Sequence, residues 1–249
     1  MTEAARVPLD EILTLREAYR RDMACQIVHD SYHARGFTDS YLLRNDGRSV
    51  GYGSVAGDEP GTRNVVKEFY VLPADRAEAL PLFRRLVEAA EARWIETQTN
   101  DAFLLLMLFE HAVELTSETI LFADACTTRH ASPGAVLRPV TEADHAGMFP
   151  HTREPVGEWG LQVGSEVAAT GGLMFHYNPP YGDIYMEVAV RHQRRGYGSF
   201  LVQELKRICY ERGGIPAARC RQDNLASRLT LQRAGMLPCA RIVRGRIAV

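Results

Sequence analysis

The chain has 249 residues, of which 46% are hydrophobic, and its formal net charge at pH 7 is −2. This length supports a sizeable core in one large or two small domains, and the near-neutral charge argues against nucleic acid as a partner, because nucleic-acid binding usually needs a basic face. The five cysteines are scattered, form no Cys-x-x-Cys pair and follow no signal peptide, so we expect reduced thiols in a cytoplasmic protein without a metal.

The first half of the chain alternates helical and extended patterns. A turn at Asn45, Asp46 and Gly47 joins two strand-like runs into a hairpin, because these residue types tolerate positive φ. The apolar run over residues 102–109 is far shorter than the roughly 20 residues that span a membrane, so we expect a core segment and no membrane partner. In chain order we predict an amphipathic helix over residues 9–29, the hairpin over 41–55 and a strand over 65–72. A helix with one apolar face over residues 77–91 and a further strand over 92–97 follow.

The second half repeats this order of elements. A break at Pro133 and Gly134 follows a polar stretch and predicts a linker. Beyond it, strands are predicted over residues 136–139, 184–190 and 216–221, and a helix is predicted over residues 199–212. We therefore predict two units, residues 1–134 and 135–249. The alternative is one elongated domain whose N-terminal part is merely mixed α and β.

The turn between the strand over 184–190 and the helix over 199–212 has the composition of an anion-binding site. A helix leaves its first backbone N–H groups unpaired and its positive dipole end exposed, and glycines let the backbone approach a ligand there. Potential cations crowd the turn and favour a ligand with several phosphates; they are Arg191, His192, Arg194 and Arg195. An ordinary helix start with solvated arginines is the alternative.

The same turn carries a family resemblance. Gln193-x-x-Gly196-x-Gly198 resembles the pyrophosphate loop of the GNAT superfamily of acyl-CoA-dependent N-acyltransferases, whose signature is Arg or Gln-x-x-Gly-x-Gly or Ala. A second GNAT motif, Asn-x-x-Ala or Ser followed by a basic residue and a Gly-aromatic pair, falls in register downstream, with Met236 in place of the aromatic residue. Its residues are Asn224, Ser227, Arg233 and Gly235. The resemblance covers residues 135–249.

Fold and co-substrate follow from this resemblance as expectations. It implies an α/β (α+β) protein of two GNAT-like units, each a mixed, mostly antiparallel twisted sheet flanked by helices, and it implies acetyl-CoA as co-substrate. Backbone N–H groups around Val188 to Val190 would polarise the thioester carbonyl. The residues that the resemblance assigns to acetyl-CoA are Val188, Ala189, Val190, Gln193, Arg194, Arg195, Gly196, Tyr197, Gly198, Ser199, Asn224, Ser227 and Arg233.

Two carboxylates are candidates for the base that deprotonates the acceptor amine. Asp183 and Glu187 share one face of the predicted strand, because side chains alternate along a strand. Several GNAT proteins place a glutamate on this strand, and Glu187 is preferred because it lies nearest the expected thioester; the alternative is that Glu187 only pairs with a neighbouring arginine. Leu231 stands where many GNAT enzymes carry a tyrosine near the CoA sulfur, so the leaving-group acid stays open.

The first half retains only the beginning of the loop pattern. Val71, Pro73 and Arg76 match the residues that introduce the GNAT loop, but Ala79 and Pro81 replace its glycines. Proline removes a backbone donor where phosphate should bind. We therefore expect the first half to be a degenerate unit that no longer binds acyl-CoA and is structural or shapes the acceptor site.

These features predict a cytoplasmic N-acetyltransferase. It would transfer the acetyl group of acetyl-CoA to a primary amine of a small molecule or peptide by direct attack in a ternary complex, as a monomer or homodimer. A non-catalytic CoA-binding or regulatory GNAT-like protein is the alternative, supported by Leu231 and the degenerate first half. A module that modifies a macromolecule is a third class, and the near-neutral charge argues against RNA as its target.

Overall fold

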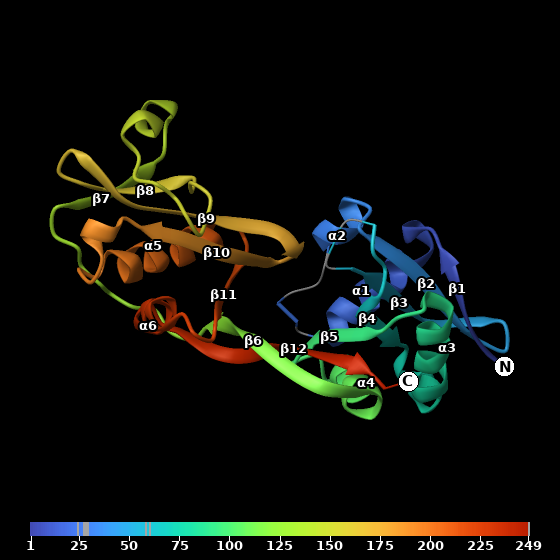
Figure 1. The fold of residues 1–249 in the computed structure, drawn as a ribbon. Helices are drawn as coiled ribbons and strands as arrows, with labels where there is room; N and C mark the ends of the chain where they lie inside the picture. Colours follow the sequence, from blue (N-terminus) through green and yellow to red (C-terminus); the bar gives the residue numbers. More distant parts are fainter. Residues whose placement is uncertain (24, 27–29, 58, 60, 249) are drawn as a thin grey trace. The chain divides into compact units, whose positions relative to one another are not determined.

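The chain forms two compact units. The structure is a computed structural model that describes residues 1–23, 25–26, 30–57, 59 and 61–248, with residues 176–178 described in backbone alone. Residues 1–118 and 240–249 make up the first unit, and residues 119–239 make up the second (Figure 1). Each unit is a mixed, mostly antiparallel sheet flanked by helices, which confirms the predicted fold class.

The first unit has strands in the order β1-β2-β3-β4-β5-β12, in which β4 and β5 are parallel. Its strands are β1 (Thr2–Val7), β2 (Thr38–Asn45), β3 (Arg48–Ala56), β4 (Val65–Val71), β5 (Trp94–Gln98) and the C-terminal part of β12 (Met236–Ile247). Its α-helices are α1 (Leu13–Asp22), α2 (Asp30–Ala34), α3 (Ala79–Ala90) and α4 (Ala102–His111), with 3-10 turns at η1 (Leu9–Ile12) and η2 (Pro73–Glu78).

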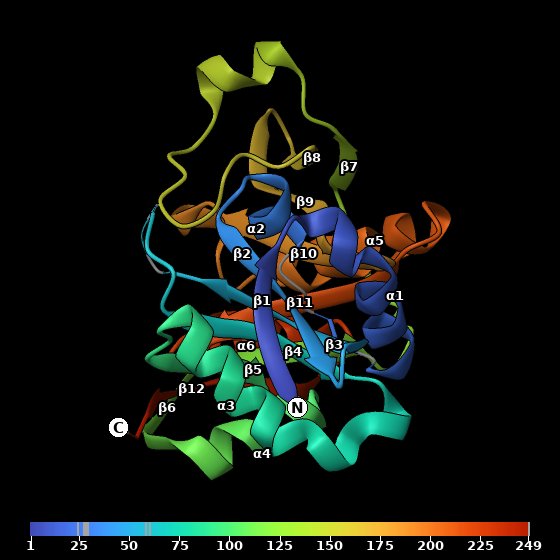
Figure 2. The same ribbon diagram turned by 90° about the vertical axis from the view of Figure 1, so that its right-hand side faces the viewer.

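Both faces of the first sheet are covered, and the alternation of side chains explains how. Helices α3 and α4 cover one face of the sheet and α1 lies on the other (Figure 2). Tyr41 and Leu43 of β2 pack into the core with α3 and α4, whereas Leu42 packs with residues of α1. Buried aromatic rings fill both cores; Phe69 of β4 meets Phe83 of α3 edge-on at a centroid distance of 4.9 Å. The helices therefore hold β4 between them.

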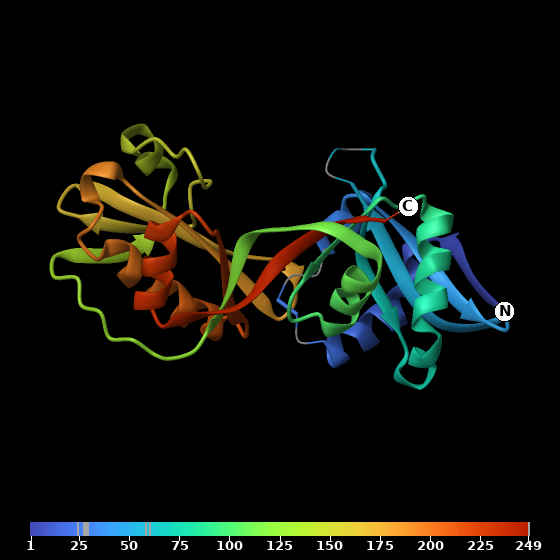
Figure 3. The ribbon, with the colours of Figure 1, turned by 60° about the horizontal axis from the view of Figure 1, so that its bottom comes forward.

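The second unit has strands in the order β6-β11-β10-β9-β8-β7, in which β10 and β11 are parallel. Its helices α5 and α6 pack against one apolar cluster of the sheet (Figure 3). Its strands are the C-terminal part of β6 (Ala112–Asp124), β7 (Ala135–Pro139), β8 (Trp159–Val163), β9 (Glu166–Asn178), β10 (Tyr181–Val188) and β11 (Ile215–Arg221). Its helices are α5 (Tyr197–Glu211) and α6 (Leu225–Arg233), with 3-10 turns at η3 (Glu142–Gly147) and η4 (Val190–His192).

Several local predictions agree with the structure. Asp46 and Gly47 have φ of 48° and 77°, as the hairpin turn requires. The apolar run over 102–109 lies within α4, whose Leu104, Met107 and Leu108 are buried. The predicted helix over 9–29 is instead a 3-10 turn followed by α1, which ends at Asp22; residues 24 and 27–29 of this prediction lie outside the described residues. No helix in the described ranges is long and apolar enough to cross a membrane.

The division between the units differs from the predicted one at residue 134. Strand β12 pairs with β5 from Ile242 opposite Gln98 to Arg246 opposite Trp94, so residues 240–249 belong to the first unit. Strand β6 pairs with β11 over residues 119–123, so the second unit begins at Thr119. Strand pairing between residues so far apart in the chain leaves no local pattern in a sequence, and the break at Pro133 and Gly134 is a loop inside the second unit.

Candidate functional site

The two parallel strands of the second unit separate soon after they begin. Strands β10 and β11 pair only from Tyr181 opposite Ile215 to Asp183 opposite Ala217, although β10 continues to Val188. Along the rest of β10 the described residues supply partners from β9 on one edge only. The N–H of Ala189 donates to the Ala168 carbonyl oxygen at 2.9 Å, so the alternation of peptide groups turns the N–H of Val188 toward the open edge. Of the backbone donors expected around Val188 to Val190, the one on Ala189 is therefore already used.

The glycine-rich turn leads directly from this open edge into α5. Helix α5 starts at Tyr197, and its first bond runs from the Phe200 N–H to the Gly196 carbonyl oxygen at 3.1 Å. Gly196 has φ of 84°, a conformation that glycine adopts without strain. Gly198 is needed for a different reason, because a Cβ there would lie 3.0 Å from both Met186 Cε and Thr230 Cγ2. The turn thus presents the N-terminal N–H groups of a helix that is packed tightly against the sheet.

The cations of the turn divide into two pairs. Arg191 and His192 each reach Glu166 of β9 at 3.0 Å. Arg194 and Arg195 are exposed. Gln193 donates from Nε2 to the Val188 carbonyl oxygen at 3.3 Å and so braces the turn against the end of β10. Positive charge and helix N–H groups are therefore available together at this turn, which suits a phosphate ligand.

The second motif residues hold the neighbouring helix. Asn224 accepts a hydrogen bond from the Ser227 N–H at 3.1 Å and caps α6. Ser199 of α5 donates to the Thr230 carbonyl oxygen at 3.2 Å, which ties the two helices together. Leu231 is buried, at 4% exposure, and offers no proton donor.

Glu187 faces away from α5 and is fully engaged with a loop. Met186 and Val188 pack toward α5, so Asp183, Tyr185 and Glu187 lie on the other face of β10. The carboxylate of Glu187 accepts backbone N–H bonds from Thr152, Arg153 and Glu154, at 3.2, 3.1 and 3.0 Å. Partial burial raises the pKa of Glu187, but these N–H groups outweigh it and hold the pKa below its ordinary value.

Asp183 has the opposite electrostatic setting. Burial disfavours the charged form and raises the pKa of Asp183; Arg219 acts to lower this pKa and Glu154 to raise it further, and the result is about 6. Its Oδ2 lies 3.3 Å from Arg219 Nε on β11, and its side chain is 14% exposed. A carboxyl group that titrates near 6 is ionised at neutral pH and still basic enough to accept a proton. From the sequence both carboxylates are candidates and Glu187 is the preferred one, because the loop hydrogen bonds and the burial that set the two apart leave no mark on the strand itself.

The corresponding place in the first unit is filled by its own side chains. Strands β4 and β5 pair only at Val65 and Val66, and Lys67 of β4 forms an ion pair with Glu96 of β5 at 2.5 Å where they separate. A cavity of about 20 Å³ remains there, large enough for a water molecule. Helix α3 starts at Ala79 after the N-cap Glu78, and Pro81 is its third residue, so residues 78–81 contain no glycine, unlike the start of α5.

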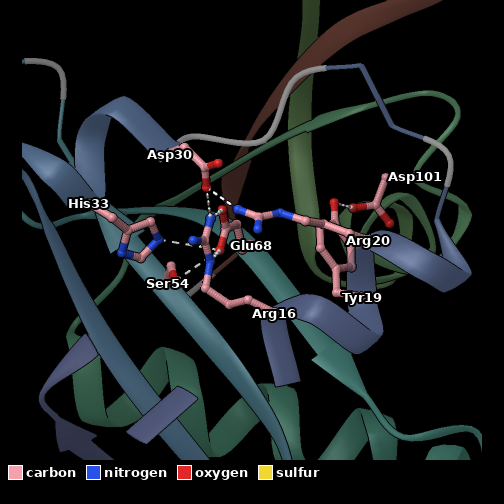
Figure 4. Close-up of polar contacts among 8 residues, drawn as sticks. All are labelled: Arg16, Tyr19, Arg20, Asp30, His33, Ser54, Glu68 and Asp101. Carbon is pink, nitrogen blue, oxygen red and sulfur yellow. Dashed lines mark hydrogen bonds and ion pairs between the residues drawn. The ribbon is translucent and has the colours of Figure 1, made fainter. Parts of the chain in front are cut away.

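Next to this cavity lies a buried polar network, shown in Figure 4. Arg16 of α1 donates to Glu68 of β4 through two hydrogen bonds of 2.8 and 3.1 Å, and Ser54 and His33 contact the same carboxylate. Tyr19 donates to Asp101 at 2.7 Å. Burial disfavours the charge on Glu68, but Arg16 and His33 outweigh it and hold the pKa of this carboxyl well below its usual range.

Replacing Glu68 should therefore destabilise the first unit. We expect Glu68→Gln to cost on the order of 3 kcal/mol of unfolding free energy, because the buried Arg16 loses its bidentate partner and retains only Asp30. Glu88→Gln, which breaks an exposed pair with Arg85, should change it by less than about 0.5 kcal/mol. Urea unfolding of both variants measures the difference, and equal midpoints would contradict the importance of the network.

The fold and site together define a class of protein. Parallel strands that separate beside a helix N-terminus with exposed arginines suit an extended, phosphate-bearing ligand along the open strand edge. Residues 124–236, which make up most of the second unit, match the model of the acetyltransferase (GNAT) family. No group of three or more His, Cys, Asp or Glu in the described part of the chain is arranged to bind a metal.

Solved structures with the same fold include GNAT proteins that match the chain over its full length. An acetyltransferase from Colwellia psychrerythraea has a TM-score of 0.76 at 12% identity, with 99% of this chain and 100% of that chain covered. A tandem GNAT protein from the clavulanic acid biosynthesis pathway has a TM-score of 0.62 at 13% identity, covering 100% and 99%. A GCN5-related N-acetyltransferase from Sphaerobacter thermophilus has a TM-score of 0.56 at 16% identity, with 100% of this chain and 96% of that chain covered. Identities this low carry the fold alone, and no curated protein sequence matches the chain.

Proposed function

We propose that the second unit is an N-acetyltransferase that transfers the acetyl group of acetyl-CoA to a primary amine of a small molecule or peptide in a ternary complex. The observation that carries this proposal is the separation of β10 and β11 beyond Asp183, directly beside the Gly196 and Gly198 turn, within a GNAT domain. The reduced thiols of the chain suit a cytoplasmic setting.

Acetyl-CoA fits the residues at this turn. The N–H groups at the start of α5 suit the pyrophosphate, and Arg194 and Arg195 add positive charge. Asn224 and Ser227 would act indirectly, because they fix α6 beside the turn. The other residues that we assign to this site are Val188, Ala189, Val190, Gln193, Gly196, Tyr197, Gly198, Ser199 and Arg233.

We assign the role of base to Asp183 in preference to Glu187. Asp183 can take a proton from the acceptor ammonium at neutral pH, whereas Glu187 is occupied by the loop that it holds. Acetyl-CoA supplies the acetyl group as a reactive thioester. The reaction forms the amide C–N bond and breaks the thioester C–S bond; of the two protons that the ammonium loses, one passes through Asp183 to solvent and the other protonates the CoA thiolate after it has left.

The buried Leu231 favours a second candidate function, a non-catalytic CoA-binding or regulatory protein. Without a tyrosine at this place, the CoA thiolate has no side-chain acid from α6. Cys220 on β11 does not replace it readily, because burial raises the pKa of its thiol. An enzyme would then release the thiolate unassisted, which lowers the rate without abolishing it.

Transfer of radiolabelled acetyl groups from acetyl-CoA to a library of small amines and peptides tests these two functions. We expect at least one amine to be acetylated by the wild-type chain and not by a variant with Asp183→Asn. Binding of acetyl-CoA without transfer to any amine or hydrolysis would contradict the enzyme and support the regulatory protein.

We further propose that the first unit is structural or shapes the acceptor site, and does not bind acyl-CoA. Its support is the ion pair between Lys67 and Glu96, which fills the separation of β4 and β5, together with Pro81 at the start of α3. This proposal predicts a single acetyl-CoA site per chain.

A further inference from the structure

Arg219 joins the two strands of the second unit at the point where they separate. It lies on β11 two residues beyond Ala217, the last β11 residue that pairs with β10, and so on the same side of the strand. Its Nε is 3.3 Å from Oδ2 of Asp183, which is the last β10 residue of the paired segment. The side chain of Arg219 is 33% exposed against 14% for Asp183, so the guanidinium reaches inward to the carboxylate.

Arg219 also acts on a second carboxylate, from a different segment. It opposes the effect of burial on the pKa of Glu154, and Glu154 in turn raises the pKa of Asp183. Glu154 is fixed because its N–H donates to Glu187 at 3.0 Å. The charged groups that face Asp183 are thus Arg219 from β11 and Glu154 from the segment before β8, with Glu187 next along the same face of β10.

A comparison of the two units supports a specific role for this ion pair. In the first unit, Lys67 and Glu96 also bridge the parallel strands where their pairing ends, but this pair is buried, at 4% and 19% side-chain exposure. There the anion is on β5 and the cation on β4. In the second unit the polarity is reversed, so that the carboxylate is on β10, and the cation is more exposed, at 33% for Arg219 against 4% for Lys67.

We propose that Arg219 is a positioning residue of the acyl-transfer reaction: its guanidinium bridges the separating strands and holds the Asp183 carboxylate, ionised, where the acceptor amine is deprotonated. This inference rests on the acetyltransferase activity proposed above. Without Arg219, Asp183 would face Glu154 with no strand-borne cation at 3.3 Å, and it would be protonated over a wider pH range.

The test compares Arg219→Met and Arg219→Lys with Arg207→Met, which removes an exposed arginine of α5 that pairs with Glu204 and Glu211. Two quantities are measured in the full chain: the pH profile of kcat/KM for acetyl transfer, and the titration of the Asp183 carboxyl carbon by ¹³C NMR, assigned with Asp183→Asn. Because removal of a nearby opposite charge moves a carboxyl pKa by about 1–3 units, we expect Arg219→Met to shift both midpoints upward by about that much. Arg219→Lys should shift them less, and Arg207→Met not at all.

The two readouts separate the inference from the proposed function. Suppose that the wild-type enzyme is active, but that Arg219→Met leaves both the low-pH limb of the kcat/KM profile and the Asp183 titration midpoint where they are in the wild type. This result would overturn the role of Arg219 alone. A uniform loss of kcat/KM at every pH in both Arg219 variants would mean a merely structural role and would also overturn it. Absence of transfer by the wild-type chain would overturn the proposed function, whatever the titration shows.

Discussion

Asp183→Asn is expected to lower kcat/KM for acetyl transfer at pH 7 by about 10²–10⁴-fold, the range for loss of a general base. The reason is that Asp183 is the carboxylate of β10 whose pKa, about 6, lets it accept a proton near neutral pH. The measurement is steady-state transfer to the best amine from the library. In the wild-type enzyme the rate should fall as the pH drops through about 6, because the base becomes protonated.

Glu187→Gln is the matched comparison on the same face of the strand. Glutamine keeps an oxygen that accepts some of the N–H bonds from residues 152–154. We therefore expect kcat/KM to fall by no more than about tenfold, and the low-pH limb of its pH profile to stay in place. A larger loss in Glu187→Gln than in Asp183→Asn, with a moved acid limb, would return the role of base to Glu187.

Asp183→Asn should also stabilise the second unit in a pH-dependent way. A carboxyl group whose pKa is raised by folding favours the native state below its ordinary pKa near 4, and this advantage is lost as the pH rises through about 6. The neutral asparagine avoids that loss, so the variant should gain up to about 2 kcal/mol at pH 7.5 and nothing at pH 4. Thermal melts at the two pH values measure this; equal gains at both would contradict the raised pKa.

Gly198→Asp is expected to weaken acetyl-CoA binding by more than about 100-fold. A Cβ at this position already lies 3.0 Å from Met186 Cε and Thr230 Cγ2, and the added carboxylate places negative charge at the helix N-terminus that should receive a pyrophosphate. Binding is measured by calorimetric titration, with circular dichroism to show that the fold is kept.

Gly147→Asp is the control for this variant. Gly147 also lies in the second unit, but a Cβ there meets nothing within 4 Å and its φ is not in the left-handed region. Its binding should equal that of the wild type. If Gly198→Asp binds acetyl-CoA as Gly147→Asp does, the turn is not the site.

The sequence predicted those features that depend on neighbouring residues. The turn from Gln193 to Gly198 follows β10 and opens α5 as expected, because glycine placement and helix-start signals are local. The pairing of β12 with β5 was not predictable, since it joins Arg246 to Trp94 across the chain. For the same reason the loop that engages Glu187 and the contact between Asp183 and Arg219 emerge only once the strands are assembled.

We propose that the second unit alone binds acyl-CoA, through the turn at Gly196 and Gly198. Calorimetric titration of acetyl-CoA into the full chain and into the double variant Gly196→Asp, Gly198→Asp tests this. We predict micromolar binding at one site per chain, lost in the double variant. No binding, two sites per chain, or one site that survives in the double variant would contradict the claim.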